Sequence, residues 1–110
     1  MSLAIITITK NDPCLHMTLD SIVMQTTKPS QFILVNGGAP ITVTGVYSNY
    51  DTIIQESDSG IYDAMNKGIE ACQASHMLFL NAGDELAYPE AVSDIIDNLV
   101  EDRITNFGME

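Results

Sequence analysis

The chain has 110 residues, and its 15 acidic and 4 basic side chains give a formal net charge of −11 at pH 7. This length is sufficient for one domain with one modest core and leaves no room for a second domain. The negative charge disfavours binding to nucleic acids and to anionic membrane surfaces, and no apolar run approaches the roughly 20 residues that a membrane-spanning helix requires.

The two cysteines and the N-terminus bear on the cellular compartment. Cys14 and Cys72 both lie in segments with a helical pattern, and they do not form a compact cysteine framework. We interpret them as free thiols in a reducing compartment, with a single disulfide as the alternative. The first residues lack the basic and apolar segments of a signal peptide. We therefore expect a cytoplasmic protein, whose association with a membrane would depend on partners.

The first half of the chain has the pattern of a strand, a helix and a second strand. Ile and Thr dominate residues 3–9, as is typical of a β-strand. Asp12 and Pro13 suit the cap and the first turn of a helix, whose apolar stripe ends before the Lys28–Pro29 pair. Residues 31–35 form a second, continuously apolar strand that stops at the polar loop 36–40.

The second half continues the alternation. Residues 41–50 show no clean period, and we expect a loop there with a short strand or turn, followed by a third strand at 52–55. Residues 61–72 carry apolar or small side chains at the spacing of a helix with one buried face. A buried strand at 77–80, a helix opened by Pro89 and the start of a fifth strand at 104–107 complete the chain. This order predicts an α/β fold with a mostly parallel sheet and helices on both faces.

Asp84 follows the fourth predicted strand in a turn that contains a glycine. In open α/β sheets, ligands bind beyond the carboxyl ends of the strands, so this carboxylate is a candidate ligand for Mg²⁺ or Mn²⁺. These cations need only one or two protein carboxylates, because water and substrate phosphates complete the coordination. The alternative is a plain turn residue at a strand end.

Other candidate site residues lie in the two preceding loops. Asp58 and Asp63 flank the start of the helix at 61–72, where free backbone N–H groups can hold a phosphate, and helix capping is the alternative for Asp58. Asn36 and Gly37 end the second strand in a loop that could hold a base or a ribose, although turn chemistry also explains them. The two histidines lack partners at metal-binding spacing, and we expect both at the surface or at its boundary.

Four motifs, taken in order, are similar to those of one enzyme family. They are IITITKN at residues 5–11, ILVNGG at 33–38, ESDSGIYDAMNKG at 56–68 and LFLNAGD at 78–84. The set resembles the nucleotide-sugar half of family 2 glycosyltransferases, and most closely the bacterial exopolysaccharide and colanic-acid type. The resemblance covers nearly the whole chain, and its third motif is the most specific.

The resemblance implies a Rossmann-like GT-A fold that binds a nucleoside-diphosphate sugar beyond the ends of its strands. Asp84 matches the last acid of the family's metal-binding DxD-like element, which implies a divalent Mg²⁺ or Mn²⁺ on the diphosphate. The implied donor-binding residues are Thr9, Asn36, Gly37, Asp58, Tyr62, Asp63 and Asn66. The chain departs from the family pattern at two of its motifs. Lys10 stands where an aromatic residue is common, and Asn36 replaces an Asp that contacts uracil, although the Asn carbonyl can still accept a hydrogen bond from an imide N–H.

From the same resemblance we expect residues 1–110 to form a single donor-binding domain that ends before the acceptor half. The family's catalytic base belongs to that second half, so no catalytic residue is assigned here. A complete enzyme would transfer the sugar, with a UDP-sugar as the expected donor, to a saccharide or lipid-linked acceptor in polysaccharide biosynthesis, with inversion at the anomeric carbon. We expect this chain alone to bind the nucleotide weakly and to transfer little or no sugar.

Two alternatives come from other functional classes. The first is a non-catalytic module that binds or senses a nucleotide sugar. The second is a receiver-like acidic signalling domain, which has similar size and a metal site. A receiver would need an acidic pair after the first strand and an Asp after the third, and the sequences at residues 10–12 and 55–56 fit that need poorly.

Overall fold

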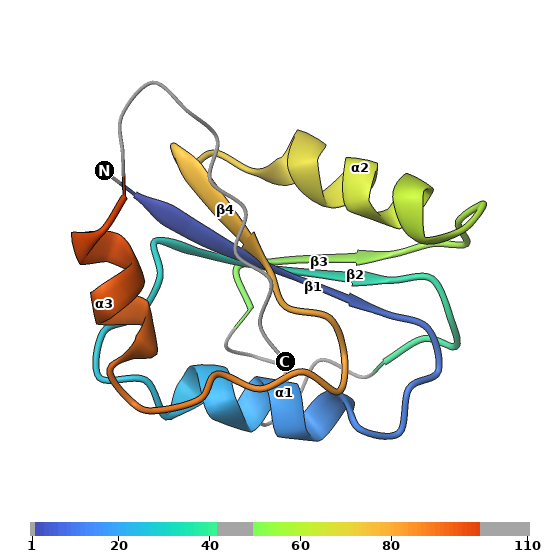
Figure 1. Cartoon of the computed structure of the whole chain (residues 1–110). Helices are drawn as coiled ribbons and strands as arrows, with labels where there is room; N and C mark the ends of the chain where they lie inside the picture. Colours follow the sequence, from blue (N-terminus) through green and yellow to red (C-terminus); the bar gives the residue numbers. More distant parts are fainter. Residues whose placement is uncertain (1, 42–49, 100–110) are drawn as a thin grey trace.

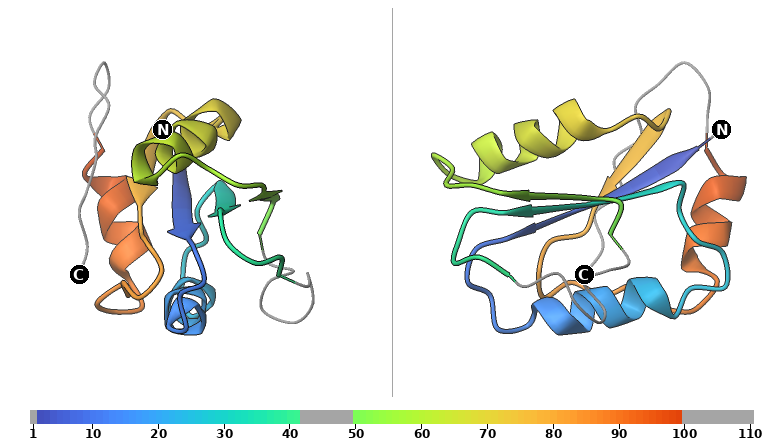
Figure 2. Two further views of the ribbon diagram at one scale, coloured as in Figure 1. Left: turned by 90° about the vertical axis from the view of Figure 1, so that its right-hand side faces the viewer. Right: turned by 180° about the vertical axis from the view of Figure 1, so that it is seen from behind.

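A computed structural model, which describes residues 2–41 and 50–99, shows a four-stranded sheet between helices (Figure 1). All strand pairs are parallel, and the strand order is β3-β2-β1-β4. The two further views show α2 on one side of the sheet and α1 and α3 on the other (Figure 2). The predicted α/β fold with helices on both faces is therefore confirmed. The elements are β1 (Leu3–Thr9), α1 (Leu15–Val23), β2 (Gln31–Asn36), β3 (Thr52–Gln55), α2 (Ile61–Ala71), β4 (His76–Phe79) and α3 (Ala91–Asp97).

The central strand β1 supplies both halves of the core. All seven of its residues are buried, and successive side chains of a strand point to opposite faces of the sheet. Leu3 and Ile5 pack in the cluster on the side of α1 and α3, whereas Ile6 and Ile8 pack in the cluster beneath α2. The apolar residues of β1 therefore lie on both faces of the sheet, and its two threonines are buried as well, as is typical of a parallel sheet covered on both faces.

The strand order creates a switch point between β1 and β4. From β1 the chain moves outward through β2 to β3 and then returns through α2 to pair β4 with the other side of β1. The β1–β4 ladder runs from the Leu3–His76 pair to the Ile6–Phe79 pair. Crevices that bind ligands in open α/β sheets lie beyond the carboxyl ends of the strands at such a point.

Helix α2 packs on the sheet through small residues, and its buried face is narrower than the sequence predicts. Ala64 and Gly68 are its buried residues, whereas Ile61 and Ile69 are exposed, contrary to the prediction that all of them line one buried face. A Cβ atom at Gly68 would lie 2.6 Å from Cγ2 of Ile6, so the glycine permits this close approach. The contact strip is narrow because the helix lies so close to the strands.

Three other predictions need correction or fall outside the structure. The residue type of Met17, Met24, Met65 and Met77 predicts that they fill the core, but Met24, the residue that follows the end of α1, has 70% of its surface exposed. His76 is buried at the first position of β4, where its ring contacts the Ser75 hydroxyl at 2.9 Å, and is not a surface or boundary residue. The short element within 41–50 and the strand at 104–107 lie outside the described residues, apart from positions 41 and 50.

The prediction of free thiols is confirmed, since Cys14 is an exposed free cysteine and Cys72 a partly buried one. Within residues 2–41 and 50–99, no helix is long and apolar enough to cross a membrane.

Candidate functional site

Two hollows meet at the carboxyl edge of the sheet, on either side of Thr9 and Asp12. The hollow on the α2 side, called the α2-side hollow below, measures about 270 Å³. The hollow on the α1 side measures about 250 Å³ and reaches Asn36 and the loop after β2. The α2-side hollow is lined by Ile8, Thr9, Lys10, Asp12, Asp58, Gly60, Ile61, Ala64, Asn81 and Ala82.

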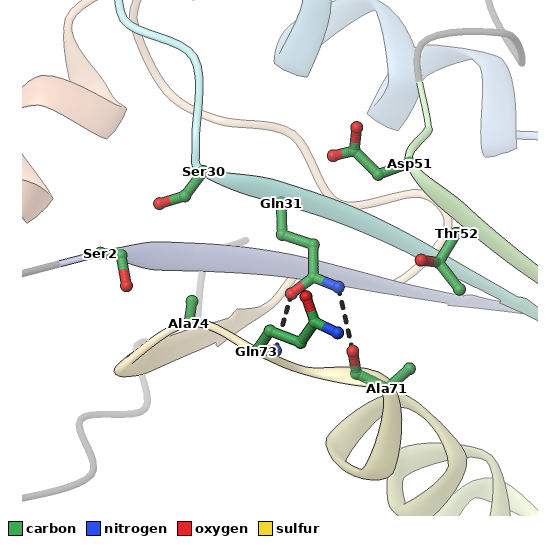
Figure 3. A pocket seen from close by; sticks show the side chains of 8 residues that line it. All are labelled: Ser2, Ser30, Gln31, Asp51, Thr52, Ala71, Gln73 and Ala74. Atoms are coloured by element: carbon green, nitrogen blue, oxygen red, sulfur yellow. Dashed lines mark hydrogen bonds between the residues drawn. The ribbon is translucent and has the colours of Figure 1, made fainter.

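A third, larger hollow lies at the opposite edge of the sheet, at the amino ends of the strands, and has a volume of about 620 Å³ (Figure 3). Its central polar side chain is already paired. The amide of Gln31 donates to the carbonyl of Ala71 at 2.9 Å and accepts from the N–H of Gln73 at 2.8 Å, as the dashed lines in Figure 3 show. Asp51 likewise accepts from the backbone N–H of Phe32 at 2.7 Å. These bonds fasten the end of α2 and the start of β3, so we place the candidate site at the carboxyl edge, where parallel sheets bind ligands.

The side chain of Asn36 uses most of its hydrogen-bonding groups to hold the loop after β2. Its Nδ2 donates to the carbonyl of Ala39 at 2.8 Å and to Oε1 of Gln55 at 3.1 Å. Its Oδ1 accepts from the N–H of Gly38 at 2.9 Å. These three bonds hold the side chain rigidly where it lines the α1-side hollow. One lone pair of Oδ1 remains to accept a hydrogen bond from a ligand. Thr9, its register partner on β1, lines both hollows.

Asp58 is a buried carboxylate at the wall of the α2-side hollow. Only 4% of its side chain is exposed, and its Oδ1 accepts from the N–H of Gly60 at 3.1 Å, at the start of α2. The same oxygen lies 4.0 Å from Nζ of Lys10, whose side chain is 62% exposed. A Cβ atom at Gly37 would lie 1.9 Å from the other oxygen, Oδ2, so the predicted Gly37 is the residue that makes room for this carboxylate. The helix cap itself is Gly60, two residues after Asp58.

Three predicted site residues on α2 do not reach either hollow. Tyr62 is 78% exposed, and Asn66 is exposed as well. Asp63 accepts from the N–H of Ser59 at 2.9 Å and lies 3.7 Å from Nζ of Lys67, so it stabilises the first turn of the helix. The structure therefore brings Thr9, Asn36, Gly37 and Asp58 to the edge of the sheet and leaves these three on the outer surface of α2.

The loop after β4 holds Asp84 in a defined turn. The N–H of Asp84 donates to the carbonyl of Asn81 at 2.9 Å, and Gly83 has a φ of +96°, a conformation that favours glycine. The hydroxyl of Thr18 on α1 accepts from the N–H of Gly83 at 2.8 Å and donates to the carbonyl of Asn81 at 3.3 Å. The side chain of Asp84 is partly buried and lines neither hollow.

The donor set at this edge suits a cation that takes most of its ligands from substrate and water. The Oδ2 atom of Asp12 lies 3.9 Å from the Cβ position of Gly83, so a second carboxylate stands beside the Gly83–Asp84 turn. No cluster of three or more His, Cys, Asp or Glu residues suited to a metal occurs among the described residues. Mg²⁺ is commonly held by one or two carboxylates together with phosphate oxygens, whereas a metal cage made only of protein side chains is not supported.

Comparison with known proteins decides the family. The model of the family described as Glycosyl transferase family 2 matches residues 4–108. The chain belongs to glycosyltransferase family 2. It is also 30% identical, over 108 residues, to the "PGL/p-HBAD biosynthesis glycosyltransferase" of Mycobacterium bovis (strain BCG / Pasteur 1173P2) and to the protein of the same name from Mycobacterium tuberculosis (strain ATCC 25177 / H37Ra). Each match covers 81% of this chain and 42% of the relative, so the chain spans about two fifths of the length of these curated relatives.

For a family 2 glycosyltransferase, the structure adds three hollow-lining residues that the sequence did not single out as site residues. Lys10 had been treated as a departure from the family pattern, and Asp12 as a helix cap, although Asp12 does bond the N–H of Cys14 at 2.8 Å. Asn81 directly follows the strand predicted at 77–80, and no role is predicted for it from the sequence. Its position as the first polar residue after β4, at the switch point, is the signal that could have identified it. Membership of this family also removes the receiver-like alternative.

Proposed function

We propose that this chain binds the nucleoside-diphosphate sugar of a glycosyltransferase, with UDP as the nucleotide and Mg²⁺ or Mn²⁺ as the cofactor. The observation that carries the proposal is the convergence of Thr9, Asp58 and Asn81 on one hollow at the switch point of a family 2 fold. These residues come from three separate segments of the chain. Convergence of polar groups on one concave site is what a ligand-binding function requires.

The charges around the hollows explain why a cation belongs to the proposal. The chain carries a net charge of −11, and Asp12 and Asp58 both line the α2-side hollow, which would repel a diphosphate. Lys10 is the cationic side chain of that lining, and its loose pairing with Asp58 leaves it free to approach an anion. A divalent cation would be held by Asp84, with Asp12 beside it. When bound, this cation would neutralise the negative charge of the departing diphosphate.

The residues around the hollows hold the remaining parts of the nucleotide in this proposal. The rigid Asn36 offers its remaining lone pair to a base N–H from the α1-side hollow. Asp58, buried and bonded to the start of α2, positions the sugar-phosphate portion at the mouth of the α2-side hollow. Tyr62, Asp63 and Asn66 remain proposed donor contacts from the outer face of α2, a role that would require a ligand extending beyond the hollows.

The remaining proposals concern the reaction of the whole enzyme. We propose inverting transfer to a saccharide or lipid-linked acceptor in exopolysaccharide synthesis of the colanic-acid type, in the cytoplasm. The resemblance of the four motifs supports this, and the mycobacterial relatives are named for PGL/p-HBAD biosynthesis. Since the chain spans 42% of these relatives, we propose that it is the donor domain and that the catalytic base belongs to the acceptor half.

Thermal shift and calorimetry with UDP, GDP and ADP, each with and without Mn²⁺, test the proposal. UDP with Mn²⁺ at about 100 times its Kd would stabilise the fold by about 2.7 kcal/mol, which corresponds to a rise in Tm of roughly 11–22 °C. Asp84→Ala should abolish the Mn²⁺-dependent part of the shift. Asp97→Ala, which removes an exposed carboxylate from α3, should leave it unchanged and serves as the matched control. If the parent shows no Mn²⁺-dependent shift with any nucleotide, the donor-site assignment is wrong.

The non-catalytic binding module remains a second candidate, because the residues of the described site are proposed to bind the nucleotide and none of them is assigned as a base. Incubation of the chain with UDP-glucose, Mn²⁺ and simple saccharide acceptors should yield little or no free UDP. Rapid release of UDP together with a glycosylated product would contradict the assignment of this chain as a donor domain alone.

A further inference from the structure

The segment before α2 that carries Asp58 is held by side chains instead of by backbone pairing. Within the described parts of the chain, residues 57–59 form no hydrogen bond with another backbone group. Backbone pairing is found on either side of them, since the N–H of Glu56 donates to β2 at 3.2 Å and the carbonyl of Gly60 accepts from α2 at 3.1 Å. The place of Asp58 in the wall of the α2-side hollow therefore depends on whatever holds this segment.

Two charged side chains of α2 hold the backbone on both sides of Asp58. The Nζ atom of Lys67 donates to the carbonyl of Ser57 at 2.8 Å. The Oδ2 atom of Asp63 accepts from the N–H of Ser59 at 2.9 Å. The same Oδ2 lies 3.7 Å from Nζ of Lys67, an i,i+4 pair on one face of the helix. Lys67 and Asp63 thus form one clamp around Asp58.

Lys67 is the central group of this clamp. Its side chain is 18% exposed, and its Nζ also lies 3.2 Å from Oε1 of Glu56. The carboxylate of Glu56 is largely exposed, and exposed ion pairs contribute little. The hydrogen bond to the Ser57 carbonyl is therefore the contact that fixes the backbone. Lys67 lines neither hollow at the carboxyl edge, so any effect on a ligand there must pass through the segment that it holds.

We propose that Lys67 is a positioning residue of the donor site, which fixes the backbone at Ser57 and so keeps the Asp58 carboxylate in the wall of the α2-side hollow. The inference rests on the proposed function, in which Asp58 positions the sugar-phosphate portion of the nucleotide. A small shift of the segment matters, because this carboxylate fits closely against Gly37 and accepts from the N–H of Gly60 at 3.1 Å. A displacement of about 1 Å is enough to break such contacts.

Calorimetry with UDP and UDP-glucose, each with Mn²⁺, tests the inference. Lys67→Met removes the ammonium group and keeps the apolar stem, and it should weaken binding of UDP-glucose by about tenfold, as expected for one lost contact to a charged group. Lys67→Arg keeps the charge and the N–H donors and should restore most of the affinity. In the Asp58→Ala background, Lys67→Met should weaken binding by less than about twofold, because the group that it positions is absent.

Gln25→Ala is the matched control for a general loss of stability. Gln25 follows the end of α1 and lines neither hollow at the carboxyl edge, although its amide is buried and bonded. Its removal should lower Tm and leave the affinity for UDP-glucose unchanged when binding is measured well below Tm. A loss of affinity equal to that of Lys67→Met would overturn the inference, since lower stability would then explain both.

An amide NMR spectrum of the free chain tests the positioning without a nucleotide. The N–H of Gly60 reports on Asp58 because it donates to Oδ1 of that residue. Lys67→Met should shift the Gly60 resonance, and Lys67→Arg should leave it near its parent position. An unmoved Gly60 resonance in Lys67→Met would overturn the inference.

The binding data contain two further refutations. Unchanged affinity in Lys67→Met, or a full tenfold loss on adding Lys67→Met to Asp58→Ala, would show that Lys67 does not act through Asp58. If the parent binds neither UDP nor UDP-glucose, the proposed function is refuted and the role in the donor site falls with it. The Gly60 resonance then still decides whether Lys67 positions Asp58.

Discussion

A side chain at Gly37 is expected to destabilise the fold, because the carboxylate of Asp58 packs against this glycine. In Gly37→Ala the new Cβ atom would lie 1.9 Å from Oδ2 and 2.8 Å from Cγ of Asp58. Ordinary contact begins near 3.4 Å, so Asp58 must move by at least about 1.5 Å. The φ of Gly37 is not in the positive range, so the substitution introduces no backbone strain of its own. The effect should therefore come from the clash alone.

The size of the effect follows from what Asp58 loses. Its side chain is 4% exposed and bonds the N–H of Gly60 at 3.1 Å, so a displacement gives up a charged hydrogen bond at the start of α2. Overpacking of a filled site costs about 1–3 kcal/mol. We expect Gly37→Ala to lower the free energy of unfolding by about 2 kcal/mol and Tm by roughly 8–16 °C. Nucleotide binding should weaken at the same time, because Asp58 leaves its place in the hollow.

A double-mutant cycle in urea separates this explanation from a general loss of stability. In the Asp58→Ala background the carboxylate is absent, and Gly37→Ala should then cost less than about 0.5 kcal/mol, a coupling of at least about 1 kcal/mol. Gly83→Ala is the control, since its cost arises from a φ of +96° with no atom nearer than 3.9 Å, and Asp58→Ala should not relieve it. Additive effects of Gly37→Ala and Asp58→Ala would refute the reasoning.

Three further predictions concern packing, pH and buried polar groups. Gly68→Ala should destabilise the fold by about 1–3 kcal/mol in denaturant titrations, because its Cβ would meet Ile6 at 2.6 Å and separate α2 from β1. Burial raises the pKa of Tyr50, and its hydrogen bond to Thr7 at 3.0 Å offsets only part of this. Stability should therefore be independent of this group below pH 10 and fall above it by up to about 1.4 kcal/mol per pH unit, a slope that Tyr50→Phe should remove in a comparison of unfolding curves. Gln25→Ala should cost about 2–4 kcal/mol by the same measurement, since the buried amide bonds three backbone groups of α1, the β4–α3 loop and α3; a loss below about 0.5 kcal/mol would contradict this role.

The elements were predictable where the local pattern was strong. Residues 3–9 and 52–55 were expected as strands and form β1 and β3 with those bounds, because β-branched side chains and flanking turn residues act locally. The start of α2 at Ile61 was predicted from its apolar spacing, whereas the exposure of Ile61 and Ile69 was not. Spacing gives the direction of a helix face, but the width of the buried strip depends on how closely the helix approaches the sheet.

The candidate site was predictable only in part. Thr9, Asn36 and Asp58 do reach the carboxyl edge, as expected from strand ends and from the family motifs. The role of Gly37 as the space for the Asp58 carboxylate involves residues 21 positions apart and has no local signature. Within the described residues, the buried side-chain oxygen of Asn81 has no hydrogen-bond partner, and this is likewise a property of its surroundings, since nothing in the residues next to it predicts it.

The sequence by itself determined the fold class, the alternation of strands and helices, the family and the acidic character of the chain. These are properties of composition, local periodicity and ordered motifs, and they are read along the chain. The tertiary structure decided that β4 pairs with β1 and so creates the switch point, that Gly37 and Gly68 are sites of close approach, and that Asn81 lines the α2-side hollow. Each of these depends on contacts between segments distant in sequence, and such contacts are set by how the whole chain packs.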